Sequence, residues 1–446
     1  MDTICVGLVG NHDTGKTTLL NAILDNEYDP KRGATVRTEQ LSFAHAELYE
    51  SGNSSRTNGV PDYRSFGRLL GMEGNAAPGH ETMSLARRVS FIDCPGNTNY
   101  VATMLKGIMM ADGVLIVTRP GGGLSQPPAL EMLAAAHLMG RSIVVVQIIR
   151  DTDDKKKAKK HRKEIRGFIT DMKICPGAEI PIVEVAKLAP GSIPSSIRSL
   201  CKEIHAMPAA NSSSAEGSSS STAALMLIGS SCVEEEESDE ETVFVTLYGR
   251  VVQGVLQQPA AGQEAVVEVR PGIVTKGGDG KTVCRPIVLK VASAAGGGVA
   301  AVRASAKITG GGPLGAVLRG GLEGHVLGHV GTLPDVYDAL KMESRVFPRV
   351  FDPYGDEMGV AVPPLEEGQQ LLLIVGTMST YGKVHSVLGR KRRESTIVVT
   401  GLTPPTCARA GDSVLICASQ RLSWHLIAAG RVVGGRPIIN GPPTSS

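Results

Sequence analysis

The sequence predicts an α/β domain with a mostly parallel sheet, followed by two β-barrel domains. Two patterns indicate this fold class. In about the first 207 residues, apolar runs typical of strands alternate with amphipathic helical patterns. After residue 242, short Val-rich runs are separated by Gly, Pro and Asp, and helical periodicity is nearly absent. The chain has 446 residues, of which 42% are hydrophobic, so about three domains with packed cores are expected.

The same patterns set the expected boundaries. They are 1–207 for the α/β domain, 208–242 for a low-complexity linker, 243–345 for the first barrel and 346–446 for the second. The linker is rich in Ser and Ala and ends in the acidic run Glu234–Glu241. Such a segment cannot bury enough apolar surface to offset the entropy of ordering. Its short apolar piece Ala223–Ile228 is a candidate docking segment.

Strands are expected where apolar, often β-branched, residues cluster. In the α/β domain these runs are Cys5–Gly10, Val89–Ile92, Gly113–Thr118 and Ile143–Ile148. In the barrels they are Val243–Leu247, Glu264–Val269, Ile287–Val291, Leu371–Val375, Ser395–Thr400 and Ser413–Cys417. Because only 4% of residues are aromatic, aliphatic side chains must fill the barrels.

Composition narrows the function classes. The net charge is +2, from 46 basic and 44 acidic residues, so any RNA-binding surface must come from local patches. No apolar run approaches the roughly 20 residues of a membrane helix, so no membrane association is expected. The chain opens directly on the apolar run Ile4–Gly10, so we expect no targeting peptide. Eight Cys without a CxxC pair suit a reducing, cytoplasmic location.

The strongest motif spans Gly10 to Thr17 and matches GxxxxGK[ST] in full. It follows a predicted strand and precedes the helical pattern Thr18–Leu24, which is the context that a phosphate-binding loop requires. Its backbone N–H groups and the helix N-terminus favour phosphate oxygens. Lys16 is expected to reach the β- and γ-phosphates, and the Thr17 hydroxyl to ligate Mg²⁺. The further expected nucleotide contacts in this segment are Asp13, Thr14, Gly15 and Thr18.

Two further elements complete a nucleoside triphosphate site. Asp93 begins the run Asp93-Cys94-Pro95-Gly96 after a predicted strand, where an aspartate holds a Mg²⁺-bound water and the Gly96 N–H can bind the γ-phosphate. Upstream, Thr35 lies on a predicted loop and is a candidate Mg²⁺ ligand when triphosphate is present. Alternatively, Thr35 is an ordinary loop threonine.

Several motifs together resemble the gamma subunit of eukaryotic and archaeal translation initiation factor 2. In the first half the similar segments are Lys31–Thr35, Arg88–Gly96 and Ala102–Leu105 with Gly107. In the second half they are Gly262–Glu264, Val269–Ile273, Gly328–Pro334, Trp424–Ile427 and Gly430–Val432. The resemblance covers nearly the whole chain apart from residues 45–85 and 208–242.

The resemblance implies a GTP-binding domain, with GTP and Mg²⁺ as cofactors, followed by two β-barrels. It implies a GTPase that carries initiator methionyl-tRNA to the small ribosomal subunit, in a complex with alpha and beta subunits. The aminoacylated end would lie between the first two domains, and such ends are read by stacking and 2′-OH contacts rather than by a large basic field.

The sequence departs from the family at the hydrolytic position. The family continues DCPGH, whose histidine positions or polarises the attacking water, whereas this chain has Asn97. An amide can hydrogen-bond a water but cannot take its proton. Asn97 is therefore a weak candidate catalytic residue, and slow or partner-dependent hydrolysis is expected.

The base-reading motif is also altered. The family's NKxD aligns with Ile148, Ile149, Arg150 and Asp151, so only Asp151 remains to accept from the guanine. A later Ser-Ala loop aligns with Val185-Ala186. Each lost hydrogen bond is worth about 0.5–1.5 kcal/mol. Alternatively, the alignment slips and Asp153 or Asp154 reads the base.

No zinc is expected, because the family's four-cysteine knuckle falls in residues 45–88, which contain no cysteine. Two basic runs are candidate RNA contacts. One is Lys155–Arg166, with eight Lys and Arg on a predicted helix, which is alternatively a solvated helix face. The other is Arg390–Arg393, in a predicted hairpin loop.

Two other functions stay open from the sequence. The first is a scaffold of the same fold that binds subunits or RNA but no longer cycles nucleotide, which Asn97 and the Ile148-Ile149 pair favour. The second is an elongation-type GTPase that delivers another aminoacyl-tRNA.

Overall fold

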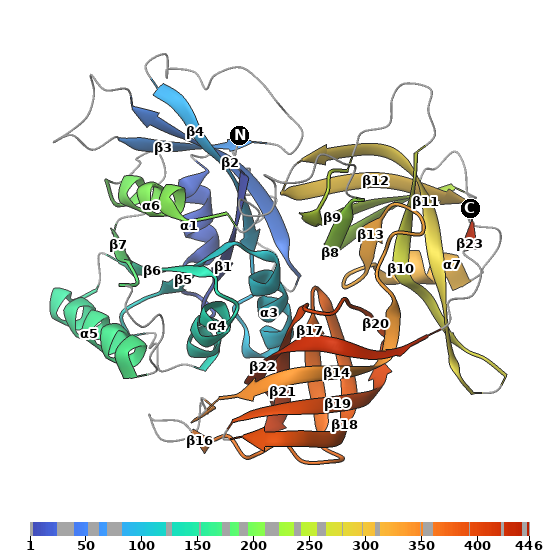
Figure 1. Ribbon diagram of the computed structural model, residues 1–446. Coiled ribbons are helices and arrows are strands. Elements are labelled where there is room, and N and C mark those ends of the chain that lie inside the picture. The colour runs from blue at the N-terminus through green and yellow to red at the C-terminus, as the bar shows by residue number, and fades with distance from the viewer. Residues whose placement is uncertain are drawn as a thin grey trace, which may run out of the picture. The chain divides into compact units, whose positions relative to one another are not determined.

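The structure is a computed structural model. It describes residues 3–24, 40–51, 62–68, 83–121, 127–150, 153–171, 179–186, 195–209, 223–235, 242–256, 265–278, 280–296, 298–307, 313–347, 349–350, 360–391, 393–420, 423–438 and 444–445. The chain forms two compact units, one built from residues 1–216 and the other mainly from residues 217–446. The first is the α/β part and the second contains both β-rich parts (Figure 1). None of the described helices is long and apolar enough to cross a membrane.

The first unit has a mostly parallel sheet of seven strands in the order β3-β2-β4-β1-β5-β6-β7. Its strands are β1 (Thr3–Val9), β2 (Ser42–Ser51), β3 (Tyr63–Arg68), β4 (Met83–Asp93), β5 (Gly113–Thr118), β6 (Ser142–Ile149) and β7 (Ile182–Ala186). Strands β4, β1, β5, β6 and β7 are mutually parallel, and β2 and β3 add an antiparallel hairpin at one edge. The predicted alternation of strands and helices is confirmed, although β4 begins earlier than the apolar run Val89–Ile92 indicates.

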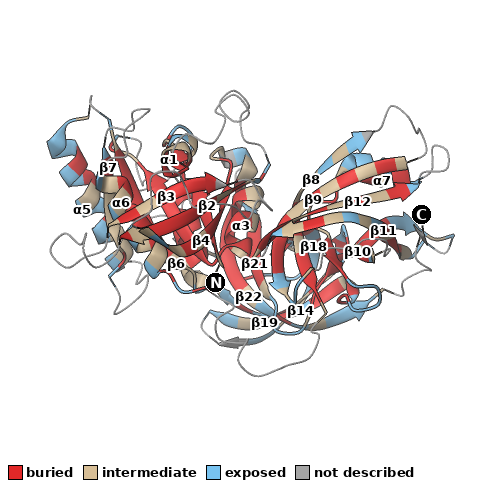
Figure 2. Cartoon of the chain, turned by 90° about the horizontal axis from the view of Figure 1, so that it is seen from above, coloured by how far each residue is buried: buried red, intermediate tan, exposed pale blue. Residues whose placement is uncertain are grey.

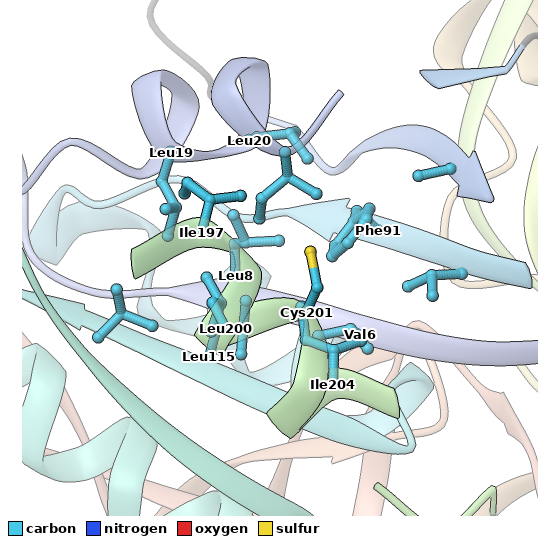
Figure 3. Close-up of a cluster of buried hydrophobic side chains, with 14 of the residues drawn as sticks. Val6, Leu8, Leu19, Leu20, Phe91, Leu115, Ile197, Leu200, Cys201 and Ile204 are labelled. Carbon is cyan, nitrogen blue, oxygen red and sulfur yellow. The ribbon is translucent and has the colours of Figure 1, made fainter. Parts of the chain in front are cut away.

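Helices cover the two faces of this sheet, as parallel strands require. They are α1 (Lys16–Ile23), α3 (Val101–Met110), α4 (Pro127–Leu138), α5 (Lys155–Asp171) and α6 (Ser195–Ala206), with the short 3₁₀ helix η2 (Thr98–Tyr100) before α3. Helix α6 shows why such segments pack, because its buried residues recur at helical spacing. These residues are Ile197, Leu200, Cys201 and Ile204, and Figure 3 shows them against Leu8 and Leu115 of the sheet and Leu19 of α1.

The second unit contains two closed antiparallel barrels. The first ring runs β10-β13-β8-β9-β12-β11 and closes through the β10–β11 pair. Its strands are β8 (Leu225–Glu235), β9 (Thr242–Gln253), β10 (Ala265–Lys276), β11 (Thr282–Gly296), β12 (Val299–Lys307) and β13 (Val326–Gly328). Helix α7 (Pro313–Gly320) precedes β13, and β23 (Thr444–Ser445) pairs with β11.

The second ring runs β19-β18-β17-β21-β22-β14 and closes through the β19–β14 pair. Its strands are β14 (Val336–Val346), β17 (Gln370–Val375), β18 (Met378–Lys391), β19 (Glu394–Thr403), β21 (Ser413–Gln420) and β22 (Ser423–Pro437). The short strands β15 (Arg349–Val350), β16 (Val360–Ala361) and β20 (Thr406–Cys407) accompany it. The two predicted barrels are therefore confirmed.

The structure corrects two expected boundaries. The linker expected at 208–242 contains β8, which pairs with β9 along most of its length, so Ala223–Ile228 belongs to a barrel and is not a separate docking segment. The boundary expected after residue 345 is also wrong, because β14 belongs to the second ring and not the first. The second ring therefore begins at Val336.

Aliphatic side chains fill both barrels, as the low aromatic content predicts. In the first ring the buried cluster includes Val245, Leu247, Leu289 and Val302, each with no exposed surface. In the second it includes Leu340, Leu371 and Ile416, also fully buried. From Thr242 to Gly249 of β9 the exposure alternates residue by residue, which is the period of a strand with one face in a core. Figure 2 shows this separation of buried and exposed residues.

Candidate nucleotide-binding site

The predicted phosphate-binding loop connects β1 to α1 at the carboxyl edge of the parallel sheet. Gly10 has φ +154°, and a Cβ there would collide with the Val117 carbonyl of β5. Gly15, at the N-cap of α1, has φ +92°, and Asp13 has φ +57°. Glycine adopts the conformations of Gly10 and Gly15 without the steric cost that a side chain brings, and aspartate is among the residues that tolerate the left-handed region found at Asp13. The motif therefore folds as the sequence predicts, with α1 beginning at Lys16.

Lys16 lies over this loop and is buried. Its Nζ donates to the carbonyl oxygens of Gly10 at 3.0 Å and Asn11 at 2.9 Å. Burial lowers the pKa of Lys16, and the nearby Asp93 charge opposes that shift. Within the described residues the Lys16 ammonium hydrogen-bonds carbonyl oxygens and forms no salt bridge, although the Asp93 charge lies nearby. Such a desolvated ammonium is a strong site for an anion.

Thr17 and Asp93 meet beside Lys16. The Thr17 hydroxyl donates to Asp93 Oδ2 at 3.1 Å. Asp93 Oδ1 is buried and has no hydrogen-bond partner among the described residues. Burial raises the pKa of Asp93, whereas the Lys16 charge and the Thr17 hydrogen bond lower it. A hydroxyl beside a carboxylate with an unused oxygen is a donor set that suits Mg²⁺ or its bound waters, so the residues present fit this metal.

Gly96 closes the loop on its other side. A Cβ at Gly96 would collide with Lys16 Nζ and would lie 2.8 Å from the Asn11 carbonyl oxygen. The structure therefore brings Gly96 and Lys16 together, as the predicted γ-phosphate contact requires. Asn97 follows it, and its side chain accepts a hydrogen bond from the Asn99 N–H at 3.0 Å. This contact caps η2, so the amide has a structural role at the position predicted to orient water.

Two hydrogen bonds that hold the phosphate-binding loop in place cannot be predicted from the motif. Asn11 is buried, and its Oδ1 accepts from the Ala129 N–H in α4 at 3.1 Å. The buried Thr14 hydroxyl donates to the Asn11 carbonyl oxygen at 2.9 Å. Both positions fall on the variable residues of GxxxxGK[ST], so the motif itself does not reveal them. Asp13 and Thr18 are exposed beside the loop.

The opposite end of the predicted site is apolar. Ile148 of β6 and Val185 of β7 are neighbours in the parallel pairing, and both are buried. The Ile148 side chain lies 3.8 Å from where a Cβ of Gly15 would be, so it reaches the end of the phosphate-binding loop. Ala186, next to Val185, is exposed. Asp151, the predicted base acceptor, lies outside the described residues.

Arg150 connects this end of the site to the phosphate-binding loop. Its guanidinium donates to the Asp13 carbonyl oxygen at 3.4 Å. Its backbone N–H donates to Asp153 Oδ2 at 2.8 Å, and Asp154 Oδ1 accepts from the Lys156 N–H at the start of α5. The alternative base readers Asp153 and Asp154 thus each have one carboxylate oxygen engaged in ordering the backbone. Arg150 therefore contacts the backbone of the phosphate-binding loop from the end of β6.

A buried polar cluster lies beneath this end. Gln147 Nε2 donates to the Ala158 carbonyl oxygen and lies 3.0 Å from His161 Nδ1. Because Ala158 offers only an acceptor, the amide nitrogen must face it, and His161 Nδ1 is then an acceptor. His161 Nε2 lies 3.4 Å from the Thr118 hydroxyl. Burial lowers the pKa of His161, in keeping with the neutral ring that this arrangement requires.

Other predicted site residues stay untested. Thr35 lies outside the described residues, so its metal contact is still an expectation. No group of three His, Cys, Asp or Glu residues with metal-binding geometry occurs in the described part of the chain. That part excludes most of the region where the family's zinc knuckle would fall, so the expected absence of zinc is also still a prediction.

Two family models match separate parts of the chain. Residues 1–215 match the family model of the elongation factor Tu GTP binding domain. Residues 338–432 match the model described as initiation factor eIF2 gamma, C terminal, which begins within β14.

Full-length relatives are similar to this chain throughout. Eukaryotic translation initiation factor 2 subunit 3 of Drosophila melanogaster is 28% identical over 470 residues, covering 98% of this chain and 90% of the relative. Translation initiation factor 2 subunit gamma of Pyrococcus horikoshii is 29% identical over 437 residues, covering 95% of this chain and 96% of the relative.

Solved structures share the fold. The apo form of translation elongation factor SelB from Methanococcus maripaludis has a TM-score of 0.63 at 16% identity, covering 98% of this chain and 81% of that one. Bacterial selenocysteine-specific elongation factor EF-Sec has a TM-score of 0.57 at 17% identity. The alignment with EF-Sec covers 96% of this chain, which spans 58% of the bacterial one.

Proposed function

Because the chain is similar to translational GTPases and, over nearly its full length, to the gamma subunit of initiation factor 2, we propose that it carries initiator methionyl-tRNA to the small ribosomal subunit. It does so as the GTP-binding member of a cytoplasmic complex with alpha and beta subunits. The observation that supports this proposal most directly is the cluster of Lys16, Thr17, Asp93 and Gly96 around one phosphate-binding loop.

In this proposal each residue has a distinct role toward the triphosphate. The Lys16 ammonium leaves its two carbonyl partners and binds the β- and γ-phosphates, while the N–H groups of Asp13 to Thr18 point at phosphate oxygens. Thr17 and Asp93, with Thr35 as a further candidate, would hold Mg²⁺. The metal neutralises phosphate charge. The Gly96 N–H binds the γ-phosphate, and Asp151 accepts from the guanine.

We also propose that hydrolysis is slow or depends on a partner. Asn97 stands where the family has a histidine, and its amide oxygen accepts the Asn99 N–H. An amide can orient a water but cannot take its proton. Single-turnover assays with and without an activating partner test this idea. Asn97→His should raise the rate without a partner, and an unchanged rate would contradict the role.

Nucleotide binding is the sharper test of the main proposal. The purified complex should bind labelled GTP in Mg²⁺ and lose most of that affinity in EDTA, and GTP should increase capture of initiator methionyl-tRNA over elongator aminoacyl-tRNA. A complex that is empty of guanine nucleotide and indifferent to its addition when tRNA is captured would end the proposal.

A second candidate is a scaffold that no longer cycles nucleotide. The observation that favours it is the buried apolar pair Ile148 and Val185 at the predicted base end. It predicts that GTP, ATP and XTP all fail to bind, with or without Mg²⁺, while subunits or RNA still bind. A preference for elongator tRNA would instead support the elongation-type alternative.

A further inference from the structure

We infer that the outer face of α5 is a docking surface for the phosphate backbone of RNA. This inference rests on the proposed function, which supplies the RNA. It adds to that function by naming a surface that contacts the RNA. It does not require bound nucleotide, because every group that carries it lies on α5.

The charges on α5 fall into two sets. Three of its eight basic residues have acidic neighbours: Arg162 pairs with Glu184, Arg166 lies 3.7 Å from Glu179, and Lys160 lies 3.8 Å from Glu164. Lys155, Lys156, Lys157, Lys159 and Lys163 are exposed and have no ion pair within the described part of the chain.

Four of the unpaired lysines share one face. Helix α5 packs through Ala158, His161 and Ile165, which are buried. At about 100° per residue, these four lysines fall within one arc of about 100°. Lys156, Lys159 and Lys163 lie on the side away from the buried residues, and Lys155 lies at the edge of that side. Figure 2 shows α5 with exposed residues beside its buried stripe. We call these four residues the lysine stripe. Lys155, Lys159 and Lys163 rise by about 6 Å at each step along the helix, so they form one row of positive charge.

The lysine stripe opposes the stability of its own helix. The first turn of α5 contains Lys155, Lys156 and Lys157 and no acidic residue, so three positive charges meet the positive end of the helix dipole. Asp154, which precedes the helix and accepts the Lys156 N–H, offsets only part of this charge. Lys155, Lys159 and Lys163 also repel each other at i,i+4 spacing. The mutual repulsion of these lysines therefore does not help α5 to fold, whereas a bound polyanion would relieve it.

The chemistry of the stripe favours RNA over an acidic protein. Protein interfaces take most of their binding energy from buried aromatic, aliphatic or Arg anchors and are depleted in Lys. The exposed side of α5 offers no aromatic or large aliphatic side chain beside the lysines. Its other exposed residues are Lys160 and Arg166, each near an acidic partner, and Glu164, Gly167 and Thr170. Lysines alone suit backbone contact, whose energy comes from counterion release and is independent of sequence.

The test measures the salt dependence of RNA binding by the full chain. The probe is a labelled RNA hairpin of arbitrary sequence, titrated at several KCl concentrations without nucleotide. The test variant combines Lys155→Gln, Lys159→Gln and Lys163→Gln. The matched control removes three exposed lysines from separate elements, by Lys202→Gln, Lys276→Gln and Lys307→Gln. Both variants lose the same net charge.

We expect the slope of log affinity against log salt to fall in magnitude by about 2 for the α5 variant, since each phosphate contact contributes about 0.7–0.9. Affinity at low salt should fall about tenfold or more, and the control should change by less than threefold. Because repulsion is removed, the α5 variant should unfold at the same or a higher temperature, which separates lost contact from lost structure.

Equal slopes for the α5 variant and the control would overturn the inference. Binding of a polyglutamate peptide through α5, with RNA binding unaffected by the variant, would overturn it in favour of an acidic protein partner. The proposed function is read separately, from the GTP dependence of initiator tRNA capture. Loss of that dependence with an intact α5 effect would remove the proposed function and leave this inference standing.

Discussion

The two ends of the candidate site differ in how they are built. At the phosphate end, backbone geometry and short contacts hold the loop. Gly10 and Gly96 admit close approach, Gly15 adopts a positive φ, and Lys16 and Thr17 each have a partner within 3.1 Å. At the base end, Ile148 and Val185 present apolar side chains, and Arg150 makes one longer contact of 3.4 Å.

The difference shows that affinity for the triphosphate and selectivity for the base can change separately. Phosphate binding relies on N–H groups and glycines, which nearly any substitution would disturb. Base reading relies on a few side chains that can be replaced without disturbing the strand that carries them. The chain is thus expected to keep its hold on triphosphates while losing part of its preference for guanine.

The largest expected effect is at the phosphate end. Gly96→Ala places a methyl group against Lys16 Nζ and the Asn11 carbonyl oxygen, so Lys16 cannot sit over the loop. Loss of a charge-assisted contact and the steric conflict should weaken GTP binding by about 100-fold or more, measured by equilibrium binding. Gly167→Ala is the matched control, because a Cβ there meets nothing within 4 Å. A Gly96→Ala protein that bound GTP normally would contradict the geometry.

Acid should weaken the strands that support the phosphate end. Burial lowers the pKa of His45 on β2 to about 4, and its Nδ1 lies 3.0 Å from the Ser90 hydroxyl of β4. As pH falls below about 6.5 the unfolded chain takes up this proton first. Stability is therefore complete above that pH and falls by up to about 3 kcal/mol as pH drops to about 4.

Urea unfolding between pH 7 and pH 4 checks this prediction. Helical circular dichroism follows mainly the first unit, and fluorescence of Trp424, the single tryptophan, follows the second. His45→Asn should flatten the pH dependence of the first unit, whereas His385→Asn, an exposed site on β18, should not. An unchanged slope in His45→Asn would assign the acid sensitivity elsewhere.

A smaller expected effect distinguishes a contribution to metal binding from a contribution to phosphate binding. Thr17→Ala removes the hydroxyl that faces Asp93, so GTP affinity in Mg²⁺ should fall by about 10- to 100-fold, with little change in EDTA. Thr17→Ser keeps the hydroxyl and should restore binding. Equal losses with and without Mg²⁺ would mean that Thr17 supports the loop and not the metal.

The smallest expected effect concerns the base end. Ile148→Asn places a polar group beside Gly15. It should raise the preference for GTP over ATP by about tenfold, which is the effect expected of one well-formed hydrogen bond. Arg150→Ala is the comparison: it removes a brace on Asp13, so both nucleotides should weaken together, by about two- to fivefold. An unchanged GTP:ATP ratio in Ile148→Asn would show that Ile148 lies away from the base.

Local pattern predicts much of this molecule, because the first strand, its glycine turn and α1 are contiguous and their geometry is set by a few residues. Strand β8 escapes prediction because a short apolar core is surrounded by Ser-rich and acidic sequence, and only pairing with β9 and β13 shows its place. Strand β14 is assigned to the wrong barrel because ring membership depends on distant partners. The Arg150 contact with Asp13 spans 137 residues, so no local pattern reports it.

The place of β8 in the first ring also matters for the design of shortened variants of this protein. Excising residues 208–242 as a dispensable tether would remove one of the six members of a closed ring. Strands β9 and β13 would then expose unpaired backbone N–H and C=O groups to solvent, and such edges promote aggregation between copies.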